Sequence, residues 1–150
     1  MKDQAQVVIV GGGIFGVNIA YHLAKLGWTD VILLEKDEIA SGATAHAAGL
    51  VTQFATSEIL MQFRKYSIEL YSELGLFDHV GSLRVASSEV QLKELERSIS
   101  KARAIGMDVE VISPEEAVKI TPFISPKDLY GAGYLPQDGH LDPYITTTTM

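Results

Sequence analysis

Three glycines near the N-terminus constrain this chain more than any other feature. Gly11, Gly13 and Gly16 form the pattern G-x-G-x-x-G and directly follow the apolar run Val7–Val10. This order predicts a buried strand, a tight turn and then a helix. The first glycine allows the sharp turn, the second lets the backbone approach a ligand, and the third lets helix and strand pack closely. The pattern is typical of the start of a nucleotide-binding α/β fold.

The residues after the turn have the spacing of an amphipathic helix. Apolar side chains recur at three- and four-residue steps, at Val17, Ala20, Leu23 and Ala24. This spacing predicts a helix from about Ile14 to Leu26 with one apolar stripe against the sheet, ended by Gly27. The start of such a helix offers unpaired backbone N–H groups and a partial positive charge, which suit a pyrophosphate.

A carboxylate ends the second predicted strand, which spans 31–34. Glu35 comes about twenty residues after the last motif glycine, where the ribose hydroxyls of a dinucleotide need an acceptor. Its negative charge also disfavours a 2′-phosphate. An ordinary βαβ unit could carry glycines alone, but strand, turn, helix, strand and acid in register favour a dinucleotide site. An NAD-dependent dehydrogenase would share these residues.

Composition excludes several classes of function. The 150 residues are 47% hydrophobic, as in a globular protein, and their net charge of −7 argues against a nucleic acid partner. No cysteine is available for a disulfide, a thiol nucleophile or a metal thiolate. No apolar run reaches the length of about 18 residues that a membrane helix needs. We therefore expect no membrane partner and a cytoplasmic protein.

A long tract of small residues follows Glu35. The segment 41–50, SGATAHAAGL, has little helical or strand periodicity. Long loops without structure in compact domains are usually functional or disordered. Small side chains let a backbone lie flat against a large planar ligand, and the hydroxyls of Ser41 and Thr44 could reach a phosphate. From the residues alone, His46 could equally be an ordinary loop histidine.

Several segments together resemble one known family. VVIVGGGIFG, VILLEK, SGATAHAAGL, GSLRVA and GYLPQDGHLDP occur in this order. They are similar to the flavin-dependent amine oxidoreductases of the D-amino-acid oxidase superfamily, and within them to the dimethylglycine and sarcosine dehydrogenase group. The resemblance spans essentially the whole chain. The S-G-x-T-x-H-A-A-G-L run is much more specific than the glycine motif.

The resemblance implies FAD as the cofactor and a role for each matching position. Ile14 and Phe15 would cover the pyrophosphate, Glu35 and Lys36 the adenosine ribose, and 42–50 the flavin side. His46 would carry a covalent bond to the 8α-methyl carbon of FAD, although some superfamily members bind FAD without a covalent link. The implied cofactor-binding residues are Gly11, Gly13, Ile14, Phe15, Gly16, Glu35, Lys36, Ser41, Gly42, Ala43, Thr44, His46, Ala48, Gly49 and Leu50.

The second half carries structural signals without a glycine fingerprint. Helices are predicted over 56–74 and 89–105, strands over 81–86, 109–112 and 130–135, and further helix starts at Ser113 and Asp142. We expect a Rossmann-like FAD-binding part at 1–78 and the start of a substrate-binding domain at 79–150. The QDGHLDP segment reads as turn chemistry around Asp138, and a metal site is not expected.

The predicted fold class is therefore α/β, with an α+β substrate part, in an N-terminal fragment of a larger flavoprotein. The predicted function is oxidation of a small N-methylated amine or amino acid by hydride transfer to the flavin, with oxygen or a carrier protein as the electron acceptor. No catalytic residue can be assigned. Two alternatives stay open: a non-catalytic or truncated nucleotide-binding module that needs a partner chain, and an NAD-dependent dehydrogenase.

Overall fold

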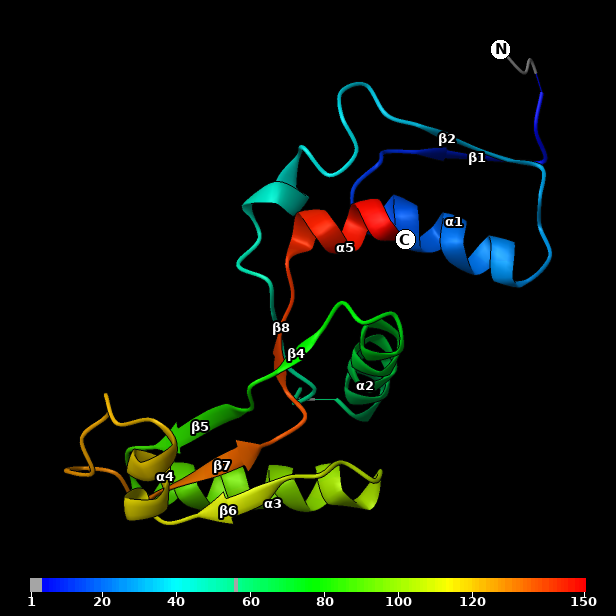
Figure 1. Cartoon of the computed structure of the whole chain (residues 1–150). Coiled ribbons are helices and arrows are strands. Elements are labelled where there is room, and N and C mark those ends of the chain that lie inside the picture. The colour runs from blue at the N-terminus through cyan, green and yellow to red at the C-terminus, as the bar shows by residue number, and fades with distance from the viewer. Residues whose placement is uncertain (1–3, 56) are drawn as a thin grey trace. The chain divides into compact units, whose positions relative to one another are not determined.

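The chain folds into two compact units. A computed structural model describes residues 4–55 and 57–150, and its contacts group the residues up to Gly49 with 141–150, and 50–140 with one another (Figure 1). The sequence predicted one boundary at 78/79. That functional division stays a prediction. By contacts, the units divide the chain at 49/50 and 140/141, and α5 (Pro143–Thr149) packs on α1 (Ile14–Lys25) of the first unit.

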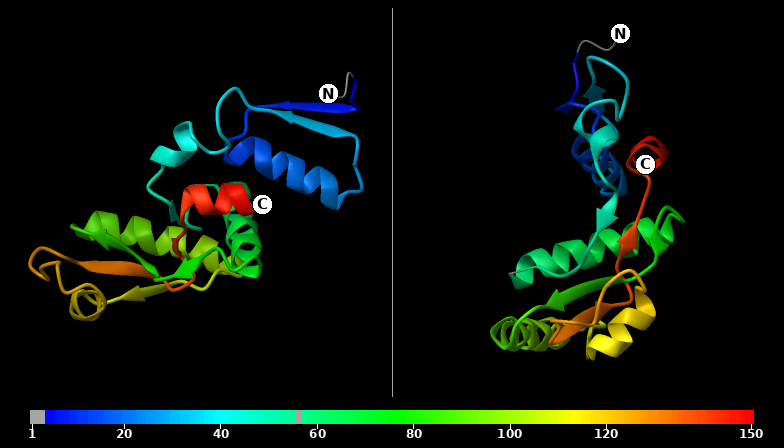
Figure 2. Two further views of the ribbon diagram at one scale, coloured as in Figure 1. Left: turned by 45° about the horizontal axis from the view of Figure 1, so that its top comes forward. Right: turned by 90° about the vertical axis from the view of Figure 1, so that its left-hand side faces the viewer.

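The first unit is a βαβ arrangement. Strands β1 (Val7–Val10) and β2 (Val31–Leu34) pair in parallel, from Val7 with Val31 to Val10 with Leu34. Helix α1 packs on both strands, and Ile9 and Val17 are buried. Figure 2 shows α1 along one side of the strand pair. These elements have the predicted bounds within one residue, so the α/β prediction is confirmed for this unit.

The first unit also contains the loop after β2. Residues 43–46 form a short 3-10 helix, η1 (Ala43–His46), where the sequence showed no clear periodicity. Helix α5 packs against η1 as well as α1. Thr146 and Thr147 are each 1% exposed, so the threonine run is part of this interior.

The second unit is built around an antiparallel sheet in the order β5-β7-β6. Its strands are β5 (Ser82–Ala86), β7 (Gly131–Leu135) and β6 (Glu110–Ile112). Helix α3 (Glu89–Ala104) covers one face, and α4 (Pro114–Ile120) packs against β7 (Figure 2). The core lies mainly between α3 and the sheet, where Ile99 and Ala102 are almost fully buried.

A small second sheet and a long helix complete this unit. Strands β3 (Leu50–Val51) and β4 (Asp78–His79) both pair antiparallel with β8 (Gly139–His140), in the order β3-β8-β4. The sequence did not predict these two-residue strands. Helix α2 (Glu58–Glu73) begins after Ser57, whose hydroxyl accepts from the N–H of Leu60. The predicted start at Thr56 lies outside the described residues.

Candidate cofactor groove

The glycine turn has the geometry that the sequence predicted. Gly11 has φ +109°, which favours glycine, and its N–H donates to the carbonyl of Leu34 at 2.7 Å. A Cβ at Gly16 would collide with the carbonyl oxygen of Gly11. The turn therefore brings α1 into close contact with the end of β1, and it begins beside Leu34, the last residue of β2.

Thr44 caps α1 from the loop. Gly13 is the N-cap residue and has no side chain to satisfy the first N–H groups of the helix. The N–H of Ile14 donates instead to Oγ1 of Thr44 at 3.1 Å, across 30 residues. A Cβ at Gly13 would come within 3.0 Å of the same oxygen. The loop residue thus lies directly at the helix start, where sequence reasoning had expected a phosphate-binding hydroxyl.

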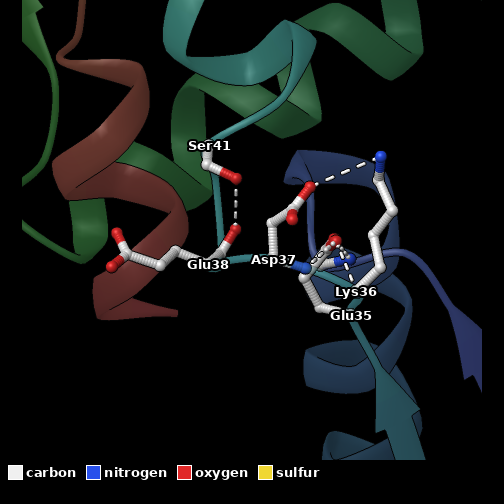
Figure 3. A network of polar contacts seen from close by, with 6 residues as sticks. Glu35, Lys36, Asp37, Glu38 and Ser41 are labelled. Carbon is white, nitrogen blue, oxygen red and sulfur yellow. Dashed lines mark hydrogen bonds and ion pairs between the residues drawn. The ribbon is translucent and has the colours of Figure 1, made fainter.

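Glu35 joins the second strand to the glycine turn. Its Oε2 accepts from the N–H of Gly12 at 2.6 Å, and its Oε1 accepts from the N–H groups of Lys36 at 2.7 Å and Asp37 at 3.1 Å. The bonds to Lys36 and Asp37 are visible in Figure 3. The bond from Gly12, followed by the bond from Asp37, holds the pKa of Glu35 below its usual range. The carboxylate is therefore ionised at neutral pH beside the turn.

The residues after Glu35 are tied to one another and to the turn. Lys36 Nζ lies 3.4 Å from a carboxylate oxygen of Asp37, and Ser41 Oγ donates to the carbonyl of Glu38 at 2.7 Å (Figure 3). The N–H of Ala40 donates to the carbonyl of Gly12 at 3.0 Å. The hydroxyl proton of Ser41 is thus used within the loop, and Lys36 is paired with its neighbour.

The glycine turn and the residues after β2 line an open groove of about 590 Å³. Every predicted cofactor residue from Gly11 to Thr44 lines it. These residues come from the glycine turn, the first turn of α1, the segment after β2 and the start of η1. Three further lining residues, Val10, Leu34 and Asp37, were not predicted. Their positions follow from the strand ends: Val10 and Leu34 are paired last residues of β1 and β2, and Asp37 comes just after them.

The remaining predicted residues do not line the groove. His46 ends η1, is exposed, and its Nδ1 lies 3.0 Å from the carbonyl oxygen of Gly42. Gly49 accepts from the N–H of Leu141 at 3.0 Å. Ala48 is an exposed loop residue, and Leu50 begins β3 in the second unit. The structure therefore gathers the predicted pyrophosphate and ribose residues with the first part of the predicted flavin side, 42–44. The other predicted flavin-side residues, His46, Ala48, Gly49 and Leu50, are not among the lining residues.

The groove has the features of a dinucleotide site, and comparison with known proteins gives it a family. The family described as FAD dependent oxidoreductase (DAO) matches residues 6–150. The chain belongs to this family. Since FAD dependence is part of the family description, the predicted cofactor and the predicted resemblance are both confirmed. Among the described residues, no helix is long and apolar enough to cross a membrane.

Curated relatives of this DAO-family chain include several much longer proteins. It is 40% identical to human (Homo sapiens) sarcosine dehydrogenase, mitochondrial, covering 100% of this chain and 17% of the relative. It is 38% identical to human dimethylglycine dehydrogenase, mitochondrial, over 99% of this chain and 18% of the relative. It is also 38% identical to the mitochondrial pyruvate dehydrogenase phosphatase regulatory subunit of Mus musculus, over 92% of this chain and 16% of the relative.

A solved structure agrees with the fold. The L-proline dehydrogenase from P. horikoshii superimposes with a TM-score of 0.93 at 32% identity, over 99% of this chain and 41% of that chain. The mixed α/β fold class is therefore confirmed. The chain spans less than a fifth of the length of the curated relatives above and about two fifths of this structure.

Proposed function

We propose that this chain is the FAD-holding part of an enzyme that oxidises a small N-methylated amine or amino acid, of the dimethylglycine or sarcosine type. The observation that carries the proposal is the groove itself, in which the glycine turn, Glu35 and Thr44 meet at the start of α1. The names of the relatives support the substrate class. In this proposal the first unit binds the cofactor and the second belongs to the substrate side.

The groove offers donors for a pyrophosphate. Phe15 and Gly16 stand in the first turn of α1, where N–H groups have no intrahelical acceptor. Thr44 Oγ1 accepts from Ile14, and that bond does not use the proton of its own hydroxyl. We assign the pyrophosphate to these donors, with the positive end of the α1 dipole adding to the attraction.

The groove also offers an acceptor for a ribose. Glu35 is ionised and already oriented by three backbone N–H groups, so its remaining lone pairs can accept from ribose hydroxyls. Its charge and that of Asp37 would repel a 2′-phosphate. The bound isoalloxazine would accept a hydride from the carbon next to the amine nitrogen, which leaves an imine or iminium product. The described residues bind and orient; none of them is assigned as a catalytic base.

His46 is the side chain that we assign to a covalent link with FAD. The carbonyl of Gly42 can only accept, so Nδ1 of His46 is the protonated nitrogen in the observed 3.0 Å contact. The lone pair then lies on Nε2, and His46 is exposed. We therefore expect the link at Nε2. Denaturing gel electrophoresis with flavin fluorescence should give a fluorescent band that His46→Ala abolishes; release of free FAD from denatured wild type would contradict the link.

One experiment tests the proposed reaction. Full-length protein is mixed with sarcosine, dimethylglycine or proline without oxygen, and the flavin absorption near 450 nm is followed. We expect bleaching by one of the N-methylated compounds and transfer of the electrons to an added dye. Bleaching by proline alone would contradict the substrate class, and yellow protein that none of the amines reduces would contradict the reaction.

A second candidate is a non-catalytic module that acts through a partner chain. It is favoured by one observation: a relative of similar identity is named as a regulatory subunit. The same experiment distinguishes the two, because a module would show no amine-dependent bleaching. An NAD-dependent dehydrogenase is disfavoured by the match to an FAD-dependent family.

We propose the cytoplasm as the compartment, on the composition of the sequence. The dimethylglycine and sarcosine dehydrogenases that it resembles are named as mitochondrial. Fractionation of the native cells, followed by detection of the protein, tests this assignment; recovery in an organelle fraction would contradict it.

A further inference from the structure

The segment 138–141, part of the QDGHLDP motif, runs along the segment 49–53. The segment 49–53 directly follows the loop that carries the proposed flavin-side residues. Every residue of 138–141 bonds to or pairs with it: Asp138 with Gln53, Gly139 with Val51, His140 with Leu50, and Leu141 with Gly49. The segment that follows the cofactor loop therefore pairs with or bonds to four consecutive residues, 138–141.

Asp138 is the buried end of this ladder. Its side chain is 0% exposed, its Oδ1 accepts from the N–H of Gln53 at 2.8 Å, and its Oδ2 accepts from Ser82 Oγ at 2.6 Å. Its backbone carbonyl accepts from Gly81 at 2.8 Å. Burial raises the pKa of Asp138, while the bonds from Ser82 and Gln53 and the charge of Arg64 oppose that rise. A carboxylate is costly to bury, so these bonds compensate a large desolvation penalty.

Arg64 holds the next residue of the same segment. Its Nη1 donates to the carbonyl of Phe54 at 2.6 Å. The guanidinium of Arg84 lies over the Phe54 ring, 5.0 Å from its centroid. Gln53 and Phe54 are both buried. Two consecutive residues are therefore contacted by three charged side chains. Asp138 accepts from the N–H of Gln53, Arg64 donates to the carbonyl of Phe54, and Arg84 lies over the Phe54 ring.

Gly139 lets β8 lie very close to β4. A Cβ at this position would collide with the backbone carbonyl of Asp78 on β4. Strand β8 is thus pressed between β3 and β4, and Asp138 directly precedes it. The turn chemistry that the sequence suggested for Asp138 and Gly139 accounts for neither the burial of the carboxylate nor its partners.

We propose that Asp138 is a positioning residue for the cofactor loop, because it fixes the point at which the chain leaves that loop. This inference rests on the proposed function. Gln53 and Leu50 are three residues apart, about 10 Å along an extended chain. Loss of the anchor at Gln53 frees the end of β3, and a displacement of about 1 Å at a reacting group can cost about 100-fold in rate.

The test uses the full-length holoprotein and four variants. Asp138→Ala removes both bonds, and Ser82→Ala removes one of them. Asp138→Asn keeps both, because its Oδ1 can accept from Gln53 and its amide can donate to Ser82 Oγ. Asp108→Asn, an exposed carboxylate that precedes β6 in the same unit, is the matched control.

We expect Asp138→Ala to change the visible spectrum of the flavin and to lower kcat by up to about 100-fold, with a smaller change in KM. Asp138→Asn and Asp108→Asn should retain the wild-type spectrum and kcat. If Asp138→Ala does not fold, Ser82→Ala should show the same spectral change with a smaller loss of kcat.

A lower Tm in Asp138→Ala or Ser82→Ala, with unchanged flavin spectrum and kcat, would overturn the inference, because the residue would then serve stability alone. Yellow, active wild type with this result would leave the proposed function intact. Colourless wild type would overturn the proposed function and this inference with it.

Discussion

Gly16 is the residue at which the cofactor turn tolerates the least change. An added Cβ would collide with backbone, the carbonyl oxygen of Gly11, which no side-chain rotation can relieve. Gly42 offers a matched control, since it lines the same groove with φ −79° and has nothing within 4 Å of its ideal Cβ. We predict that Gly16→Ala lowers stability by about 1–3 kcal/mol. Gly42→Ala should lower stability less, because its only cost is the ψ of −139°, which lies outside the usual β region.

Thermal unfolding followed by circular dichroism measures both glycine variants. Equal melting temperatures for Gly16→Ala and Gly42→Ala would contradict the tight approach of α1 to the turn.

Glu35 links stability to pH. Its pKa is lowered chiefly by the N–H of Gly12 and then by that of Asp37, so its ionised form is favoured in the folded state. The resulting stabilisation is fully present above the ordinary value of 4.5 and is lost as the pH falls through the lower pKa of the folded state. We predict that Glu35→Gln is less stable than wild type at pH 7 and that the difference shrinks below pH 4.5.

Urea unfolding of wild type, Glu35→Gln and the control Asp37→Asn across this pH range tests the linkage. Asp37 bonds through its carboxylate only to the exposed Lys36 in the described residues, so its variant should show little change. A difference between wild type and Glu35→Gln that persists unchanged at pH 3 would count against this account.

At the scale of elements, helix starts are set by local chemistry. Ser113, Pro114 and Glu116 form a complete capping box at α4: Glu116 N–H donates to Ser113 Oγ at 3.2 Å, and Ser113 N–H donates to Glu116 Oε2 at 2.8 Å. We predict that Ser113→Ala lowers the free energy of unfolding by about 1 kcal/mol. Chemical denaturation measures this change.

Ser100→Ala is the control for the capping variant. Ser100 is exposed within α3 and its hydroxyl donates to the carbonyl of Glu96 in its own helix, so alanine should be neutral or slightly stabilising there. Equal losses in both variants would show that the box contributes nothing.

Local signals also explain which elements the sequence predicts. The capping box of α4 and Gly27 after α1 depend on neighbours in the chain, and both were found where expected. The strands β4 and β8 have two residues each and form by pairing with distant segments. Two residues are too few to show the alternating hydrophobic pattern that predicts a strand.

The difference between local signals and distant partners also applies to the groove and to the buried Asp138. The glycines and Glu35 belong to one local motif with fixed spacing, and they were predicted. Thr44 reaches the helix start from 30 residues away, and Asp138 reaches Gln53 from 85 residues away. The sequence showed these residues as a loop hydroxyl and a turn carboxylate, because their partners are set by tertiary folding alone.

At the scale of the molecule, the β1–β2 pair leaves apolar surface open. Val8 is 52% exposed, Val10 84% and Leu34 50%. Parallel sheets are normally covered on both faces, and uncovered strands associate with other chains. We predict that the 150-residue chain, expressed by itself, forms dimers or aggregates, and that Val8→Thr reduces this association.

Size-exclusion chromatography with light scattering measures the association. A monodisperse monomer of these 150 residues that unfolds cooperatively would contradict the prediction.

We propose that the groove between the glycine turn, Glu35 and Thr44 holds FAD. The flavin content of purified full-length protein, measured beside that of a Gly13→Val variant, tests this directly. Gly13 has φ −78°, which valine can adopt, so the variant fills the groove with little backbone strain. We predict about one FAD per chain in wild type and little in the variant, with matching far-ultraviolet circular dichroism. Wild type without flavin, or a Gly13→Val variant with full FAD, would contradict the account.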